Sequence, residues 1–99
     1  MTLPLSFNQG VSSDLKGILV FYERESGRNL AEELLAETTA CLDRVLKNPQ
    51  QFHFLVSDLR RANLKRFPYH LLYRIKSTSV RILVLRHNHR NPDFGMNRQ

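Results

Sequence analysis

The spacing of hydrophobic residues changes once along this chain, at Asn48-Pro49, and this change constrains the fold more than any other feature. Before it, apolar residues recur every three or four positions, in one series from Val11 to Tyr22 and a second from Leu30 to Leu46. After it, apolar residues alternate with polar or mixed ones from Tyr69 to Lys76. The sequence therefore predicts two helices followed by a sheet, with the proline ending the second helix.

The first helical series has signals at both of its ends. Ser12 or Ser13 is a candidate N-cap, Asp14 suits the first turn, and Gly27 is placed to end the helix. About three residues then separate the two series, so the chain must reverse tightly between them. We therefore expect the helices to form an antiparallel hairpin.

Several stretches have the composition of strands. Residues 3–7 are apolar and contain Pro4, which suits an edge strand because proline cannot donate a ladder hydrogen bond. Residues 59–66 are mostly basic, residues 69–76 alternate, and residues 80–86 are apolar on both faces, as in a central strand. The order predicts an α+β fold: a two-helix antiparallel hairpin packed on a small, three- to four-stranded, mainly antiparallel sheet, with element order β-α-α-β-β-β.

The length of 99 residues is that of one domain, so we expect a single domain over residues 1–99. This excludes an enzyme with separate cofactor and substrate domains. A folded chain of this size buries roughly 60 to 65% of its unfolded surface, which favours a surface site over a deep pocket. Beyond Asn91 only Phe94 is apolar enough to anchor the chain, so residues 91–99 are expected to be a flexible tail.

The single cysteine, Cys41, cannot form an internal disulfide. The N-terminal residues lack a basic region followed by a long apolar run, so nothing indicates secretion. No apolar run approaches the ~20 residues that a membrane helix needs. We therefore expect a cytoplasmic protein without a membrane segment.

The net charge of the chain is +6, and this excess of positive charge comes entirely from its second half. Residues 1–47 carry five Lys and Arg against seven Asp and Glu, whereas residues 48–99 carry ten against two. A net charge of +8 over one half attracts polyanions, so the partner is expected to be a nucleic acid or an acidic protein segment. The alternative is that the charges only solvate one face of the domain.

The candidate chemistry lies at the end of the last predicted strand, in Arg86, His87, His89 and Arg90. Arginines can hold a phosphate and stabilise its transition state, and imidazoles exchange protons near pH 7. The alternative is that Arg86 and Arg90 pair with acidic neighbours while His87 packs at the rim of the sheet. His87 and His89 have no third ligand at a recognisable spacing, so a metal site is not expected.

A second basic set precedes this cluster and is a candidate for binding nucleic acid or a target protein: Arg60, Arg61, Lys65, Arg66 and Arg74. In a meander, alternation would place Arg60, Arg74 and Arg86, or their neighbours, on a shared surface. Tyr69 and Tyr73 share a phase with the core positions and are expected to be buried, whereas His70 and Arg74 face the other way.

Two segments of the second half carry a family resemblance: RRANLKRFPYHLLYRI, from Arg60 to Ile75, and VRILVLRHNHRNPDF, from Val80 to Phe94. They resemble the RelE/ParE superfamily of toxins from type II toxin-antitoxin modules, particularly its ParE-like plasmid-stabilisation group. The N-terminal SSDLKGILVFYERES fits the same pattern, so the resemblance covers nearly the whole chain. It implies a helical hairpin on a small sheet, no cofactor, and a cognate acidic antitoxin that holds the toxin inactive in a hetero-oligomer.

The resemblance leaves the target open. Some members cleave mRNA in the ribosome with basic side chains and a His, Tyr or Glu acid or base, and others inhibit DNA gyrase. The C-terminal GMNRQ lacks the tyrosine that some RNA-cleaving members carry, but His87 or His89 could move the proton while Arg86 and Arg90 hold the phosphate. The sequence leans slightly toward ribosome-dependent mRNA cleavage; a gyrase inhibitor and a non-toxic or decayed antitoxin-binding module are the alternatives.

Overall fold

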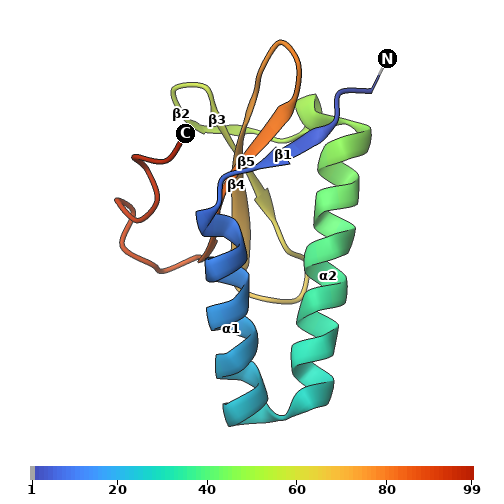
Figure 1. Ribbon diagram of the computed structural model, residues 1–99, viewed down its shortest axis with the longest axis vertical. Helices are drawn as coiled ribbons and strands as arrows, with labels where there is room; N and C mark the ends of the chain where they lie inside the picture. Colours follow the sequence, from blue (N-terminus) through green and yellow to red (C-terminus); the bar gives the residue numbers. More distant parts are fainter. Residues whose placement is uncertain (1) are drawn as a thin grey trace.

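The computed structural model describes residues 2–99 and contains two long helices beside a sheet (Figure 1). The elements follow one another as β1 (Leu5–Phe7), α1 (Gly10–Ser26), α2 (Arg28–Lys47), the short 3-10 helix η1 (Pro49–Gln51), β2 (Phe54–Val56), β3 (Leu59–Asn63), β4 (Tyr69–Ile75) and β5 (Val80–His87).

Within residues 2–99 the sheet has five strands in the order β1-β5-β4-β3-β2. Among these described strands the β1–β5 pair is parallel and the other three pairs are antiparallel. The predicted α+β class and helical hairpin are confirmed, and β5 has a strand on each side, as its two apolar faces indicated. The sequence analysis missed β2, whose Phe-Leu-Val run is short and exposed throughout, so it has no alternation of burial to recognise.

The reversal between the helices is tighter than expected, because Gly27 alone separates them. Its φ of 93° and ψ of 166° lie in a region that is open essentially to glycine only. The prediction that Ser12 or Ser13 caps α1 was wrong. The helix begins earlier, at Gly10, whose N–H donates to Asn8 Oδ1 over 2.8 Å.

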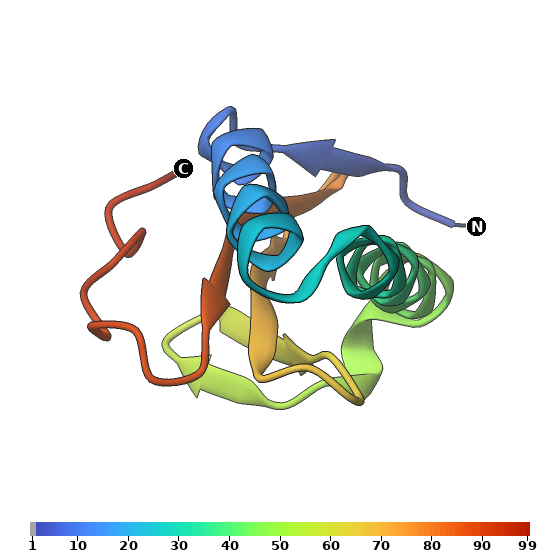
Figure 2. The same ribbon diagram turned by 90° about the horizontal axis from the view of Figure 1, so that it is seen from below.

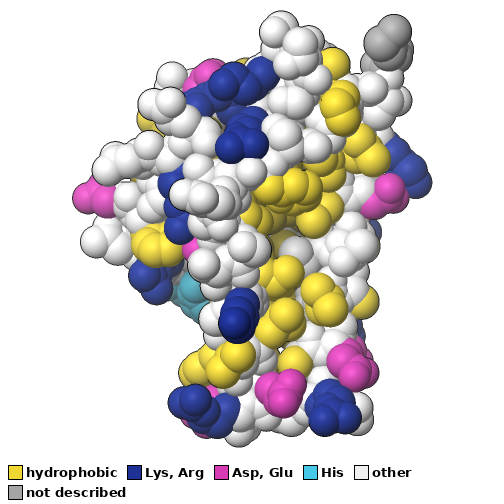
Figure 3. Space-filling model, viewed as in Figure 1, with side chains coloured by type: hydrophobic (Ala, Val, Ile, Leu, Met, Phe, Trp, Pro, Cys, Tyr) yellow, Lys and Arg dark blue, Asp and Glu magenta, His cyan; other side chains and the backbone are white. Residues whose placement is uncertain are grey.

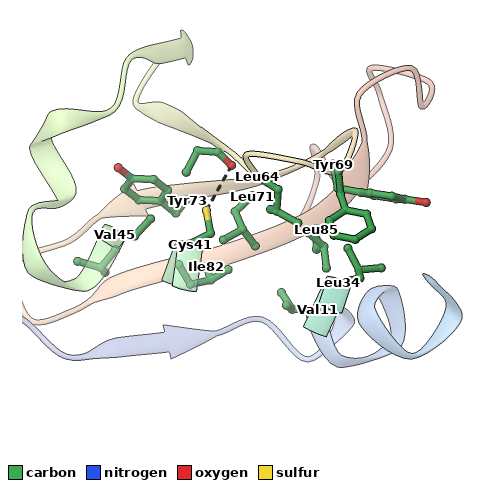
Figure 4. Packing of buried hydrophobic residues seen from close by; sticks show 13 residues of the cluster. Val11, Leu34, Cys41, Val45, Leu64, Tyr69, Leu71, Tyr73, Ile82 and Leu85 are labelled. Carbon is green, nitrogen blue, oxygen red and sulfur yellow. Dashed lines mark hydrogen bonds between the residues drawn. The ribbon is translucent and has the colours of Figure 1, made fainter. Parts of the chain in front are cut away.

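The main core lies between the helices and one face of the sheet (Figure 4). Leu34 and Cys41 from α2 meet Leu71 and Tyr73 from β4, and all four are fully buried. The Cys41 thiol lies 3.8 Å from the carbonyl oxygen of Ala62, and burial raises its pKa. Tyr69 and Tyr73 are core residues, as predicted.

The opposite face of the sheet is covered by the C-terminal segment, residues 90–99, which runs along the side away from α2 (Figure 2). Phe94 and Met96 pack on a second buried cluster that includes Leu83 and Val84. Arg98 adds an ion pair, 2.6 Å from Asp14 of α1. The expectation that Phe94 alone anchors this segment was therefore wrong, because Met96 and Arg98 also hold it.

Candidate functional site

The strand-end cluster is divided by the structure, because Arg86 is turned into the protein. Its side chain lies on the face of β5 opposite the helices and only 6% of the residue is exposed. Nη1 donates to the carbonyl oxygens of Pro92 and Phe94, at 2.8 and 3.0 Å, and Nε donates to His70 Nε2 at 3.0 Å. Arg86 thus fastens the C-terminal segment to the sheet. Burial and the nearby charge of Arg61 lower the pKa of its guanidinium.

His70 completes this buried network and is held in its neutral form. Nε2 accepts from Arg86, so Nδ1 carries the proton and donates to Asn88 Oδ1 over 2.8 Å. Burial lowers the pKa of His70 to about 4, which the hydrogen bond to Asn88 only partly offsets. The residue is 1% exposed. Sequence reasoning placed His70 on this face but gave it no role; the signal was a histidine opposite Arg86 on the next strand.

His87 points to the other side of β5 and packs at the rim of the sheet. Its ring lies edge-on to Tyr69, with ring centroids 5.1 Å apart. Nδ1 accepts the backbone N–H of His89 over 3.0 Å, and the two imidazole rings lie 5.6 Å apart. In neutral His87 the proton is therefore on Nε2, and the only ring lone pair is already engaged.

A surface groove of about 530 Å³ runs between α1 and the end of β5. His87 and Arg90 line it together with Tyr22 and Tyr69. Burial raises the pKa of Tyr69 to about 12, with Tyr22 adding to the effect, so this phenol stays protonated near neutral pH. The Arg90 guanidinium stacks on Phe94, 4.1 Å from the ring centroid. Among residues 2–99, neither Arg86 nor Arg90 pairs with an acidic side chain.

The second basic set is split between the two faces of the sheet. Arg60 is the register partner of Tyr73, which faces the helices, so Arg60 does not share a surface with Arg74 or Arg86. Its neighbour Arg61 does, since it pairs with Leu72 on the other face. Arg61, Arg74 and Arg86 therefore lie on the same face of the sheet, but Arg86 is buried there and does not form a surface with the other two.

The members of this set differ in how far they are engaged. Arg66 forms ion pairs with Glu37 and Glu33 of α2, at 3.2 and 3.9 Å, and Lys65 beside it is exposed. Although burial opposes the change, the N–H groups of Arg66 lower the pKa of Glu37.

On the far face of the sheet, Arg61 donates to Asn63 Oδ1, and Arg74 lies 2.8 Å from Asp58. Arg81 of β5 lies directly opposite Arg74 in the ladder. Arg81 contributes to the positive charge of the second half, but it was not among the residues predicted for this surface. Its position between the inward-facing Val80 and Ile82 was the signal.

A third feature is an apolar groove of about 280 Å³ where β1, α1 and α2 meet. Phe7, Val11, Leu15 and Leu42 line it. The space-filling view shows hydrophobic side chains forming a band between the two helices and toward β1 (Figure 3). Nothing in the sequence analysis marked this groove, because its residues were assigned to the core.

Clusters of metal ligands and helices that could cross a membrane also bear on function. In the part of the chain that the structure describes, no three His, Cys, Asp or Glu side chains gather as metal ligands. No helix within residues 2–99 is long and apolar enough to cross a membrane.

Comparison with known proteins gives a family. Residues 5–92 match the family model described as ParE toxin of type II toxin-antitoxin system, parDE. A solved chain from the chromosomal ParDE toxin-antitoxin system of P. aeruginosa has the same fold, with a TM-score of 0.78 and 19% identity over 87% of this chain and 96% of that one. No curated protein matches. Because the family model covers most of its length, the chain belongs to the ParE toxin family of type II toxin-antitoxin systems.

Proposed function

We propose that this ParE toxin inhibits growth by binding a target protein, DNA gyrase, rather than by cleaving RNA. The observation that carries the proposal is the position of Arg86. Arg86 borders the groove beside His87, but it is only 6% exposed and its Nε and Nη1 donate to His70 and to two backbone carbonyls, so its guanidinium is not presented to a phosphate. The sequence alone slightly favoured mRNA cleavage, and this proposal reverses that preference.

The contacts of His87 and the protonated state of Tyr69 support the same proposal. A general base needs a free lone pair within reach of the proton that it removes. In neutral His87 that lone pair accepts the N–H of His89, and Tyr69 has a pKa of about 12. A nuclease would have to break the His87–His89 contact before either ring nitrogen of His87 could serve as a base.

RNA cleavage is the second candidate, and one observation favours it. His87 and Arg90 line the same groove, so a proton-transfer group and a fixed positive charge face one space large enough for part of a nucleotide. His89 is exposed beside them and is a second imidazole for such a mechanism.

The cognate partner in this proposal is an antitoxin of the ParD type. The solved structure with the same fold comes from a ParDE system. The apolar groove between β1, α1 and α2 offers hydrophobic contact, and the charge of the second half favours acidic segments. Toxin and antitoxin would then form a hetero-oligomer.

The test is to induce the chain in a host cell with and without its antitoxin, and to assay the purified chain on gyrase and on translating ribosomes. Blocked supercoiling with intact transcripts supports the proposal. Transcripts cut at defined positions, with cutting lost in His87→Ala or His89→Ala, would replace it by the nuclease. Unchanged growth on induction alone would indicate a non-toxic antitoxin-binding module.

A further inference from the structure

The β2–β3 hairpin, at the edge of the sheet farthest from β1, carries three consecutive exposed apolar side chains. Phe54 is 58% exposed, Leu55 40% and Val56 50%. A run of this kind is rare on a water-facing surface unless the surface binds something. None of the three lines the groove beside His87 or the apolar groove beside β1.

The apolar residues are held in place by polar contacts around them. The Arg60 guanidinium stacks 4.0 Å from the centroid of the Phe54 ring, and its Nη1 donates to the Phe52 carbonyl over 2.8 Å. At the turn, Asp58 is bound to Arg74 of β4. The hairpin is thus largely ordered before any partner arrives, which lowers the entropy lost on binding.

The hairpin is poorly suited to accept a further strand. β2 has only three residues, and its register with β3 shifts between Phe54 and Val56. Short edge strands and bulges are features by which proteins prevent strand addition. A partner would therefore meet the side chains of the hairpin rather than its backbone.

The charges around the hairpin indicate what kind of partner fits. Arg60 and Arg61 follow the turn, and Asp58, which is the one acidic residue in the segment 52–63, is already paired with Arg74. A second copy of this chain would bring like charges together, which opposes self-association. A protein surface with an apolar socket and carboxylates around it is complementary.

Its place in the fold separates the hairpin from the apolar groove. The groove lies at β1, and β5, β4 and β3 separate β1 from β2 in the sheet (Figure 1). A partner seated in the groove would leave the hairpin at the opposite edge.

We propose that Phe54, Leu55 and Val56 dock the toxin on its target protein by inserting the edge of the hairpin into an apolar socket rimmed by acidic side chains. The socket would contact both faces of β2, because Phe54 lies opposite Arg60 and Val56 lies opposite Leu59, and these two neighbours in β3 face opposite sides of the sheet. This inference rests on the proposed function, in which the toxin acts by binding. It adds that the element engaging the target is distinct from the groove offered to the antitoxin.

The experiment compares Phe54→Ser, Leu55→Ser and Val56→Ser with two control variants on the helices, Val20→Ser on α1 and Leu35→Ser on α2. The control residues are exposed to a similar degree, 49% and 42%, and neither lines the groove beside His87. Each purified chain is assayed for melting temperature, affinity for the antitoxin, and inhibition of supercoiling by purified gyrase. Growth arrest on induction is measured in parallel.

The hairpin variants should keep their melting temperature and antitoxin affinity but need at least about tenfold more protein to inhibit gyrase, the loss expected for central interface residues. The two control variants on the helices should inhibit gyrase like the original chain. If the original chain arrests growth without affecting gyrase, the proposed target is wrong, and loss of growth arrest in the hairpin variants then decides the inference.

Three results would overturn the inference. The first is full growth arrest by all three hairpin variants. The second is loss of antitoxin affinity in those variants with toxicity kept, which would assign the patch to the antitoxin. The third is a dimer of the original chain that becomes monomeric in the hairpin variants, which would assign it to a second copy. A chain that causes no growth arrest at all removes both the proposed function and the inference.

Discussion

Replacing Gly95 by alanine should detach the C-terminal segment from the sheet. Gly95 has a φ of 79°, and a Cβ at this position would lie 2.5 Å from Val84 Cγ2 and 3.0 Å from Cγ1. Val84 is a buried branched side chain in the middle of β5 and cannot move aside cheaply. The substitution therefore adds a steric conflict to an unfavourable backbone conformation.

The two costs can be estimated separately. A positive φ costs a non-glycine residue about 1 to 2 kcal/mol, and overpacking a filled core costs about 1 to 3 kcal/mol. Together they lower the free energy of unfolding by about 2 to 5 kcal/mol. If the C-terminal segment leaves the sheet instead, the stability lost equals the free energy with which that segment docks. A loss of 2 kcal/mol lowers the melting temperature of a domain of this size by about 8 °C or more.

Urea unfolding and trypsin cleavage after Arg90 measure the two outcomes. Gly17→Ala and Gly27→Ala are the matched controls, because a Cβ at either position meets no atom within 4 Å. Gly17 lies inside α1, so alanine there should stabilise by about 1 kcal/mol. Gly27→Ala should cost only backbone strain, about 1 to 3 kcal/mol. If Gly95→Ala unfolds and is cleaved like the original chain, residues 91–99 are a flexible tail and the reasoning is refuted.

Four further outcomes are expected. His70 binds protons more weakly in the folded chain than in the unfolded chain, with a pKa of about 4 against 6.5. The free energy of unfolding should therefore fall by about 3 kcal/mol as the pH drops from 6.5 to 4. Urea titrations at each pH should show that His70→Gln removes this part of the loss. Arg86→Met should cost about 2 to 4 kcal/mol by leaving buried carbonyls unpaired, and Arg86→Lys should restore only part of it in the same titration. Tyr73→Phe should cost about 1 kcal/mol in thermal unfolding, because its hydroxyl donates to a backbone carbonyl. Asp14→Asn and Arg98→Met should be non-additive in a double-mutant cycle, since each residue is the other's partner.

The elements that repeat a period over many residues could be predicted from the sequence. The two helices and the central strand β5 are long enough for their buried residues to form a recognisable pattern of apolar positions in the sequence. β2 could not be found, because three exposed residues carry no burial pattern. The start of α1 was missed because Asn8 satisfies its first N–H group from outside the helix.

The residues of the strand-end cluster could be named from the sequence, but their arrangement in space could not. Arg86, His87, His89 and Arg90 are close in sequence, but alternation along β5 sends Arg86 to one face and His87 to the other. Which face the C-terminal segment would cover depends on Asp14, more than eighty positions away from Arg98. No local pattern in a single sequence records such a contact.

The parallel pairing of β1 with β5 also limits how early the fold can form during synthesis. β1 is synthesised long before its partner residues, Val80 to Ile82. Likewise, Asp14 is synthesised long before Leu85 and Arg98, which donate hydrogen bonds to its carboxylate. Contacts between such distant positions form late, because the entropy cost of closing a long loop comes before the favourable free energy of the contacts. In a nascent chain β1 is therefore unpaired, and Asp14 lacks its two partners, until residues 80–98 have been synthesised. A transcript broken before the codons for these residues should yield a chain in which the parallel pair and the Asp14–Arg98 ion pair cannot form.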